Sequence, residues 1–547
     1  MHNLIESSQQ KYFNNIYMIL LVFSSYGADE KQKSEDKFEN KFNMSYIYFG
    51  NSSLYTDRVD CTRNSLNEIS PNYFNIDESG NLSLTPALDK KFIEDMHERG
   101  VRVVPFISNH WDRAAGLAAL HNRKKLAADV ADVINTYDLD GINVDIENVT
   151  EKEREMYTDF VRILRETLPD DKTIAVAVAA NPNGFTTGWH GSYDYARLAK
   201  YSDYLMFMAY DEHYQNSKPG PVSSMSFSRK TIESALKEVP KEKIVLGIPF
   251  YGRIWKNDSD DFQGNGVSIK RAEELIRTYK GIVTFDEKSK SPYAVITINE
   301  KDSKPKVYGE TLTSGTYTIW FENEESIKHK LKLVQEFDIK GTGSWSLGDE
   351  EENTWDYYKL WLNGCYFNDA EGHWAADYIL SAYKNNLIKG MTENSFKPEE
   401  PLTRAQAAVI MVRLLDYDTF AERNKTFDDI LGHWAQASID TARRNGIING
   451  IGDNIFKPEG PVTREQVAVM LDNILKQKMK SEREVNSNHG FSDVTIKNNS
   501  WSYESICAMK QYGIISGFSD GSFKPAQALT RAEMTVLIDK FASFIEQ

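Results

Sequence analysis

The segment Asp140-Gly-Ile-Asn-Val-Asp-Ile-Glu147 alternates apolar and polar residues from its third position onward. This period of two predicts a β-strand with one apolar face and one face that carries Asn143, Asp145 and Glu147. Burying carboxylates without partners is costly, so such a face needs partners or a function. An amphipathic helix is expected at 151–168, which places the strand in a β–α unit covered on both faces. An edge strand with one wet face is therefore the less favoured interpretation.

Strand-like and helical patterns alternate eight times around this segment, over about 320 residues. This alternation predicts a (β/α)8 TIM barrel over 44–363. The interval at about 256–318 is too long for one crossover and predicts a small inserted β-rich subdomain. In such a barrel the chemistry lies at the carboxyl ends of the strands, where Glu147, Tyr210, Asp211 and Trp345 fall. The strands are expected at 44–50, 68–76, 101–108, 141–147, 173–180, 203–211, 243–251 and 341–347.

Three separate motifs of this barrel resemble family 18 glycoside hydrolases, the chitinases and endo-β-N-acetylglucosaminidases. The opening segment resembles the signature Asp-Gly-x-Asp-x-Asp-x-Glu, with Asn143 where the family usually has aspartate. Met208-Ala-Tyr-Asp211 resembles the family's Met-x-Tyr-Asp strand, and Trp345 its late-strand tryptophan. A closer resemblance, over about 44–363, is to the spore-cortex-lytic and germination-type members. It rests on Asn67-Glu-Ile-Ser-Pro71, Glu147-Asn-Val, Met208-Ala-Tyr-Asp-Glu-His213, Pro219-Gly-Pro, Gly247-Ile-Pro-Phe-Tyr-Gly and Trp345-Ser-Leu-Gly.

The resemblance implies that Glu147 is the general acid, which protonates the glycosidic oxygen and later activates water. We expect Asp145 to raise the pKa of Glu147, because a nearby carboxylate disfavours ionisation. Two carboxylates at i and i+2 of one strand lie about 7 Å apart and side by side, so they do not flank the scissile bond. The family's solution is attack by the substrate's own 2-acetamido group, which Asp145 and Tyr210 would hold and polarise.

The other site residues are assigned by the same resemblance. Asn143 and Asp140 would support Asp145, and with an amide at 143 Asp145 cannot pass its proton inward, which affects the pH profile. Trp345 would be a platform for a sugar ring. No metal or cofactor is expected. The predicted substrate-binding residues are Asp140, Met208, Asp211 and Trp345.

After Cys365 the composition changes and a unit of about 60 residues repeats three times. The units open at Phe367-Asn-Asp, Phe427-Asp-Asp and Phe491-Ser-Asp, and each later contains Phe-Lys-Pro and Thr-Arg. They resemble S-layer homology (SLH) repeats, which bind secondary cell-wall polysaccharide. We expect a mostly α-helical domain with repeats at 366–424, 425–488 and 489–547. The tryptophans Trp374, Trp434 and Trp501 are interpreted as core residues.

Each repeat also contains a capping box, which begins at Thr403, Thr463 or Thr530 and opens an apolar helix. The cap does not explain the arginine that follows the threonine, because a cation in the first turn opposes the helix dipole. Arginines here suit an anionic ligand that uses the guanidinium and the free amides, although a merely solvated side chain is the alternative. The predicted polymer-binding residues are Arg404, Arg464 and Arg531.

The composition and the N-terminal segment further limit the possible partners and the location of the protein. A net charge of −16 disfavours nucleic acid as a partner. The three cysteines form neither a disulfide framework nor a metal site, and a Cys61–Cys365 pair is the minor alternative. The apolar run Ile16–Phe23 is too short to span a bilayer and predicts a signal peptide at 1–27, followed by a disordered lead-in at 28–43. No later segment is expected to cross a membrane.

These observations predict a secreted glycosidase attached to the bacterial cell wall or S-layer through an anionic secondary polymer. Its substrate would be a polysaccharide that contains N-acetylhexosamine. Wall anchoring and the cortex-lytic resemblance favour a peptidoglycan N-acetylglucosaminidase, with a chitinase as the first alternative. A non-catalytic glycan-binding surface protein is the second alternative, disfavoured by the joint presence of Glu147, Asp145 and Tyr210. The sequence leaves endo versus exo cleavage open.

Overall fold

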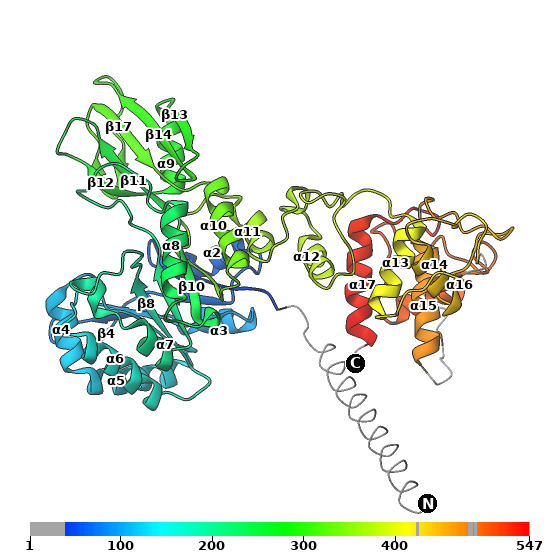
Figure 1. Cartoon of the computed structure of the whole chain (residues 1–547), viewed down its shortest axis with the longest axis horizontal. Helices are drawn as coiled ribbons and strands as arrows, with labels where there is room; N and C mark the ends of the chain where they lie inside the picture. Colours follow the sequence, from blue (N-terminus) through cyan, green and yellow to red (C-terminus); the bar gives the residue numbers. More distant parts are fainter. Residues whose placement is uncertain (1–38, 423–425, 480–484, 486–489, 546–547) are drawn as a thin grey trace, which may run out of the picture. The chain divides into compact units, whose positions relative to one another are not determined.

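The computed structural model describes residues 39–422, 426–479, 485 and 490–545 (Figure 1). The predicted signal peptide and most of the predicted lead-in lie outside these residues. Within them, the chain folds into two compact units. The first consists of Lys41–Leu380 and Gly390–Glu399, and the second includes Ser381–Lys389 and the residues from Glu400 onward. No helix among the described residues has the length and apolar character needed to cross a membrane.

The first unit is built on a sheet that is parallel except for one short antiparallel strand at its edge, and this sheet closes into an eight-stranded barrel. The hydrogen-bonded order is β4-β3-β6-β7-β8-β9-β10-β18-β1-β2-β5. Since β2 and β3 are consecutive pieces of one barrel strand, and β5 and β6 of the next, the same two barrel strands stand at both ends of this order once the short strand β4 is set aside. The predicted (β/α)8 fold is confirmed. The pieces are β1 (Phe42–Ile47), β2 (Glu68–Pro71), β3 (Phe74–Ile76), β4 (Leu82–Leu84), β5 (Arg102–Val103), β6 (Phe106–Ser108), β7 (Gly141–Asp145), β8 (Thr173–Ala179), β9 (Tyr204–Met208), β10 (Ile244–Pro249) and β18 (Gly341–Trp345).

The break between β5 and β6 falls at Val104 and Pro105. Proline has no N–H for the ladder, which explains why the strand is interrupted there. The carbonyl of Pro105 still accepts a hydrogen bond from Asn143 N at 2.9 Å, so β7 stays in register beside it. The helices of the barrel follow the predicted alternation, with α2 and α4 in addition. They are α2 (Tyr55–Cys61), α3 (Lys90–Glu98), α4 (Arg113–His121), α5 (Arg123–Tyr137), α6 (Arg154–Thr167), α7 (Tyr195–Tyr201), α8 (Met225–Ala235), α10 (Glu324–Glu336) and α11 (Thr354–Leu362).

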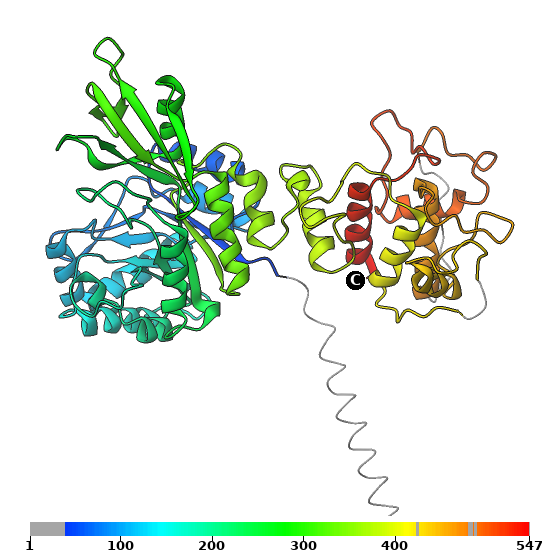
Figure 2. The same ribbon diagram turned by 45° about the horizontal axis from the view of Figure 1, so that its top comes forward.

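The insertion forms a five-stranded antiparallel sheet in the order β12-β11-β17-β14-β13. It has its own core, in which Leu275 of α9 packs with Ile254, Ile296 and Tyr317. Figure 2 shows this sheet as a separate layer outside the barrel. The elements are β11 (Tyr251–Lys256), β12 (Gln263–Ser268), α9 (Ile269–Thr278), β13 (Ile282–Asp286), β14 (Ser291–Ile298) and β17 (Gly315–Trp320), with a small hairpin of β15 (Lys306–Val307) and β16 (Glu310–Thr311).

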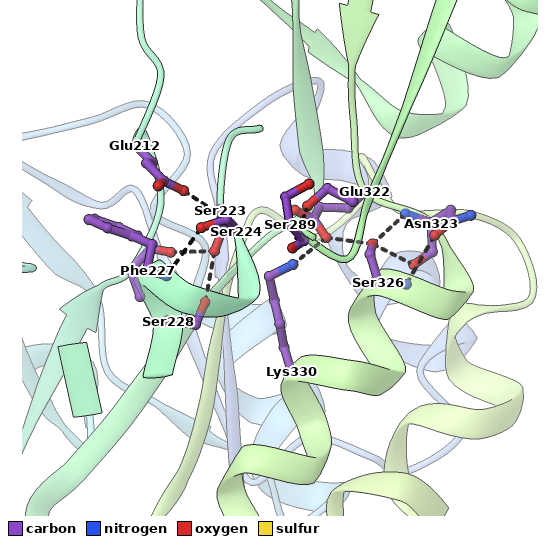
Figure 3. A network of polar contacts seen from close by, with 12 residues as sticks. Glu212, Ser223, Ser224, Phe227, Ser228, Ser289, Glu322, Asn323, Ser326 and Lys330 are labelled. Atoms are coloured by element: carbon purple, nitrogen blue, oxygen red, sulfur yellow. Dashed lines mark hydrogen bonds and ion pairs between the residues drawn. The ribbon is translucent and has the colours of Figure 1, made fainter. Parts of the chain in front are cut away.

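A buried ion pair ties the end of this sheet to a barrel helix (Figure 3). Lys330 on α10 lies 2.7 Å from the carboxylate of Glu322, which follows β17, and both side chains are 1% exposed. Ser326 donates a further hydrogen bond to the same carboxylate at 2.6 Å. Burial raises the pKa of Glu322, and Lys330 opposes that shift. Removing either partner would leave a buried charge uncompensated, so the pair fixes how the insertion joins the barrel.

The opening of the first predicted repeat packs on the barrel helices. Glu371 accepts a hydrogen bond from Trp361 Nε1 of α11 at 2.7 Å and pairs with Lys328 of α10 at 2.8 Å. On the next helix, α12 (Ala376–Lys384), Asp377 lies 2.9 Å from Lys359. The compact barrel unit therefore extends beyond residue 363, where the sequence predicts the barrel domain to end.

The second unit is helical, and its three repeats are joined in a closed cycle. Leu402 N donates to Leu529 O, Leu529 N to Val462 O, and Val462 N to Leu402 O, at 2.8–2.9 Å. The predicted capping boxes at Thr403, Thr463 and Thr530 are confirmed. The helices of this unit are α13 (Arg404–Leu414), α14 (Gln436–Arg444), α15 (Arg464–Lys478), α16 (Tyr503–Gln511) and α17 (Arg531–Ile545).

The arginines after the caps connect the repeats in the same cyclic order. Arg404 donates to the carbonyls of Asn449 and Phe456 in the second repeat, at 2.8 and 2.7 Å. Arg464 likewise donates to two carbonyls of the third repeat, those of Ser516 and Phe523. Arg531 closes the cycle by donating to Lys389 O of the first repeat at 2.6 Å. Arg404 and Arg531 are buried, so the solvated alternative is wrong for them.

Two expectations about other side chains need correction. Trp374, Trp434 and Trp501 are 62%, 64% and 57% exposed, so their interpretation as core residues is wrong. Buried phenylalanines such as Phe396 and Phe456 fill the repeat cores instead. Cys61 is an exposed free thiol, so it does not pair with Cys365.

We predict that Arg404→Ala destabilises the repeat domain by about 2–6 kcal/mol, because two carbonyls would each lose a donor, at about 1–3 kcal/mol each. Denaturant unfolding of the full chain, followed by a signal from this domain, measures the effect. Arg413→Ala is the matched control, since Arg413 is exposed on the same helix. Equal stability of the two variants would contradict a connecting role for Arg404.

Candidate active site

The carboxyl end of β7 carries Glu147, and side chains from elsewhere hold its backbone. β7 ends at Asp145, so Ile146 and Glu147 lie beyond the sheet ladder. Asn109, directly after β6, accepts a hydrogen bond from Glu147 N at 2.8 Å and donates to Glu147 O at 2.9 Å. Ile146 N donates to the hydroxyl of Tyr157, and Ile146 O accepts from that of Tyr193. This arrangement fixes the direction in which Glu147 leaves the barrel.

Asn143 and Asp145 lie beneath Glu147 on the same strand face, inside the barrel. Both are buried, and Asn143 Nδ2 donates to the hydroxyl of Tyr46 at 3.0 Å. The Oδ1 atoms of both residues have no hydrogen-bond partner among the described residues. A buried polar atom without a hydrogen-bond partner lowers the stability of the fold. Such atoms therefore call for an explanation, and a catalytic role is one of those known.

The pKa values of both carboxyl groups are raised. Burial raises the pKa of Asp145 to about 7, and a hydrogen bond from Ser108 opposes the shift. Burial also raises the pKa of Glu147 well above its ordinary value, and the negative charges of Asp145 and Asp211 add to the effect. The predicted influence of Asp145 is therefore present, but desolvation is the larger cause. The raised pKa of Glu147 favours its protonated form, which is the form that a general acid needs.

Residues after β9 and β10 form a second polar group beside Glu147. Asp211 accepts hydrogen bonds from Tyr251 at 2.7 Å and from Arg253 Nε at 2.8 Å. Met208 and Tyr210 pack, partly buried, against the same core cluster as Trp345. The structure thus brings the predicted residues of strands β7, β9 and β18 to one end of the barrel.

A cleft of about 890 Å³ opens at this end. Glu147, Tyr210 and Asp211 line it together with aromatic side chains that include Trp111 and Trp189. A smaller hollow of about 290 Å³ contains Trp345 and shares Asp211 and Arg253 with the cleft. Pockets that combine rings with a few convergent polar groups are typical of ligand sites.

The loops around the cleft hold non-glycine residues in the left-handed region. Positive φ angles occur at His110 (47°), Trp111 (65°), Asn148 (58°) and Asp211 (57°). Each follows the carboxyl end of a barrel strand. Such strain persists only where the surroundings enforce it, and it gathers at functional sites. Here Asn148 Nδ2 donates to Trp111 O at 2.9 Å, which couples two of these loops.

Asp140 does not belong to this site. It precedes β7 and so lies at the opposite end of the strand from Glu147, roughly 20 Å along the chain path. Its carboxylate accepts a hydrogen bond from Val103 N at 2.7 Å and contacts His97 Nε2 at 2.8 Å. We therefore replace the predicted substrate contact with a structural role, which connects β7 to α3 and β5.

Sequence reasoning missed Asn109, Tyr46, Trp111 and Arg253. Asn109 and Trp111 stand in Ser108-Asn-His-Trp111 at the end of a predicted strand, so their position was a usable signal. Arg253 lies only two residues beyond the predicted end of another strand. The contact of Tyr46 with Asn143 spans 97 residues and has no local signal.

Comparison with known proteins places this site in a family. Residues 31–350 match the model of glycosyl hydrolases family 18. The chain belongs to that family. Residues 366–408, 426–468 and 490–535 match the S-layer homology domain, which agrees with the three repeats of the sequence.

Three proteins show the extent of the similarity. The chain is 30% identical over 220 residues to the uncharacterized glycosylase YvbX of Bacillus subtilis (39% of this chain, 59% of the relative). It is 25% identical over 237 residues to the cortical fragment-lytic enzyme of the same organism (43% and 52%). The spore cortex-lytic enzyme SleL of Bacillus cereus shares the fold, with a TM-score of 0.52, 20% identity and coverage of 60% and 76%. The chain spans only about half to three fifths of the length of such curated relatives.

We predict that Asn143→Asp moves both limbs of the pH profile of kcat/KM to higher pH, by about one unit. A further buried carboxylate on the same strand face disfavours ionisation of Asp145 and Glu147, so each loses its proton at higher pH. Initial rates from pH 4 to 10 on a soluble N-acetylglucosaminide measure both limbs. Asn143→Ala controls for loss of the amide, and an unmoved profile in Asn143→Asp would contradict the expected charge coupling.

Proposed function

We propose that this chain is a retaining glycoside hydrolase that cleaves β-1,4 bonds after N-acetylglucosamine by a substrate-assisted mechanism. One observation carries the proposal. Glu147 is held at the edge of a sugar-sized cleft by Asn109, and buried Asp145 lies one alternation beneath it. Membership of family 18 supports the same chemistry.

In the first step Glu147 gives its proton to the glycosidic oxygen, and the bond to the anomeric carbon breaks. The carbonyl oxygen of the 2-acetamido group forms the new bond, because Asp145 lies on the same strand face as Glu147 and is poorly placed to attack from the opposite side. Asp145 and Tyr210 hold the acetamido group, and the negative charge of Asp145 stabilises the oxazolinium ion. Asn143 supports Asp145 from below. Met208 and Asp211 lie beside the sugar, and the ring of Trp345 is the platform on which the sugar stacks.

In the second step Glu147 is a carboxylate and takes a proton from water. The water oxygen attacks the anomeric carbon, and the oxazolinium ring opens to restore the acetamido group. Two displacements on opposite faces return the anomeric carbon to its original configuration. The same residue serves as acid and then as base, as microscopic reversibility requires.

Peptidoglycan is the proposed substrate, and chitin oligosaccharides are the alternative. The cortical fragment-lytic relative and the SLH repeats favour cell-wall glycan. A non-catalytic glycan-binding protein is the third candidate, and the raised pKa of Glu147 and the hydrogen bonds that hold its backbone weigh against it.

We predict that Glu147→Gln lowers hydrolysis by at least about 100-fold, since general acid catalysis contributes about 10²–10⁴-fold. Thiazoline analogues of N-acetylglucosamine should inhibit, because they resemble the oxazolinium ion, and de-N-acetylated substrate should not be cleaved. Product analysis with an aryl N-acetylglucosaminide and purified peptidoglycan measures both effects. Trapping a glycosyl ester on Asp145 by mass spectrometry would overturn the substrate-assisted mechanism.

The proposed location is outside the cell, on the wall or S-layer. The three SLH repeats would bind an anionic secondary wall polymer, with Arg404, Arg464 and Arg531 as the proposed cationic partners. These guanidinium groups also connect the repeats, so their substitution cannot separate binding from folding. The exposed tryptophans offer a cleaner probe, because large rings open to solvent suit contact with sugars.

We predict that joint replacement of Trp374, Trp434 and Trp501 by Ala weakens binding of the full chain to wall sacculi at least about tenfold. Aromatic contacts contribute about 0.5–1.5 kcal/mol each. Sedimentation with sacculi measures binding, and sacculi stripped of secondary polymer give the background. The triple Trp→Tyr variant, which keeps a ring at each place, should retain most of the binding. Undiminished binding of the Ala variant would exclude these rings as contacts.

A further inference from the structure

The substrate cleft divides into two halves that meet at Asp211 and Arg253, which line both. Trp345 lies in the smaller half with Phe49 and Tyr308, whereas Glu147 lies in the larger half. Tyr210 and Met208, which with Trp345 hold the reacting sugar in the proposed mechanism, line the larger half, so the reacting sugar lies where the two halves meet. The sugar that leaves with the proton of Glu147 then occupies the rest of the larger half. The leaving-group half is the part of the larger cleft that lies on the far side of Glu147 from Trp345 and is lined by Trp111, Phe185, Trp189 and Tyr214.

Aromatic side chains dominate the leaving-group half. Trp111, Phe185 and Tyr214 line it and are 50%, 54% and 57% exposed, although large rings are usually more buried. The ring centroids of Trp111 and Trp189 lie 5.1 Å apart. Such surfaces suit the apolar faces of pyranose rings, and they offer no charge of their own.

The ionisable side chains of this half are mainly carboxyl groups, of which Glu147 has a raised pKa and Asp211 is paired with Arg253. Glu147, Asp211 and Glu212 line it, and Arg253 is its only lysine or arginine among the described residues. Arg253 is occupied: Nε and Nη2 lie 2.8 and 2.7 Å from Asp211 Oδ1, and Nη1 donates to Gly264 O at 2.7 Å. Burial lowers the pKa of His190, so this imidazole is neutral at neutral pH.

The acidic side chain of Glu212 is held in place. Its carboxylate accepts a hydrogen bond from Ser224 N at 2.8 Å, and its own N–H donates to Val222 O at 2.9 Å. Ser224 in turn caps α8 through Phe227 N at 3.1 Å (Figure 3). This hydrogen bond holds the carboxylate of Glu212 beside the N-terminus of α8, within the lining of the larger cleft.

We propose that the leaving-group half selects an N-acetylhexosamine that carries no free carboxylate. N-acetylglucosamine fits this requirement, as does N-acetylmuramic acid whose lactyl carboxyl is closed in an amide. The free acid of N-acetylmuramic acid does not fit, because its carboxylate meets fixed negative charge and finds no available cation. This inference rests on the proposed function and adds the chemical class of the leaving sugar.

Transfer to added acceptors tests the selection directly, since an acceptor enters the position of the leaving group. With an aryl N-acetylglucosaminide as donor, O4 of the acceptor attacks the anomeric carbon and gives its proton to Glu147. The acceptors are the methyl glycosides of N-acetylglucosamine, of N-acetylmuramic acid, and of its N-methylamide. We expect the amide to be glycosylated at least about tenfold faster than the acid, and equal rates would overturn the proposal.

Three variants examine the cause. Tyr214→Lys places a cation in the leaving-group half and should reduce the amide-to-acid ratio at least about threefold, whereas Tyr214→Gln, the neutral control, should leave the ratio near its original value. Glu212→Gln should also reduce the ratio. A ratio that none of these changes alters would show that shape, and not charge, sets any preference, and would overturn the proposal.

A binding measurement separates failure of this inference from failure of the proposed function. Quenching of tryptophan fluorescence by the same three glycosides needs no turnover and reports on Trp111 and Trp189. If the enzyme does not hydrolyse the donor, the proposed function is wrong. Tighter binding of the two neutral glycosides than of the acid would support the selection even then. Equal binding of acid and amide would refute the selection even in an active enzyme.

Discussion

The site depends on one constraint: the backbone of Ile146 and Glu147 must be satisfied after the sheet has ended. A buried N–H or C=O without a partner costs about 1–3 kcal/mol, and four such groups follow β7 in two residues. Three side chains meet all four, with Asn109 serving both groups of Glu147. Because Asn109 follows β6 directly, the position of the acid is set by the register of two neighbouring strands. A barrel supplies this register more rigidly than loops would.

The electrostatics of the site follow from the same enclosure. Desolvation is the largest cause of the raised pKa values of Asp145 and Glu147. A carboxyl group is desolvated only where the surrounding protein excludes water from it. Asp211 remains beside them because Arg253 and Tyr251 hold it. The site thus combines a carboxyl group whose pKa is raised, Glu147, with a carboxylate paired with an arginine, Asp211, and such a difference in environment is typical of sites for acid and base chemistry.

Local patterns predicted the barrel, the insertion, the three repeats and the main site because each has a short-range signal. Alternation located Asn143, Asp145 and Glu147 on one face, and the capping boxes began the helices where expected. The family signature includes Asp140 without saying where on the strand each of its positions lies, and Asp140 precedes β7 whereas Glu147 follows it. The partners of Arg404 lie 45 and 52 residues away, and Glu371 pairs with Lys328 across 43, beyond the range of any local pattern. The sequence does not reveal that Trp374 is exposed, because tryptophan side chains are buried on average and this average does not decide the position of a single side chain.

The cycle of Leu402, Leu529 and Val462 also has a consequence for the order of the chain. Each repeat contributes one donor and one acceptor, so the cycle has no first or last member. Topologically, the three repeats are related as the blades of a propeller are, and the point at which the chain enters is incidental. A circularly permuted arrangement, cut between two repeats and rejoined at the old ends, would preserve every bond of the cycle. Genetic rearrangement could therefore move the attachment point of a catalytic domain around this unit without dismantling it.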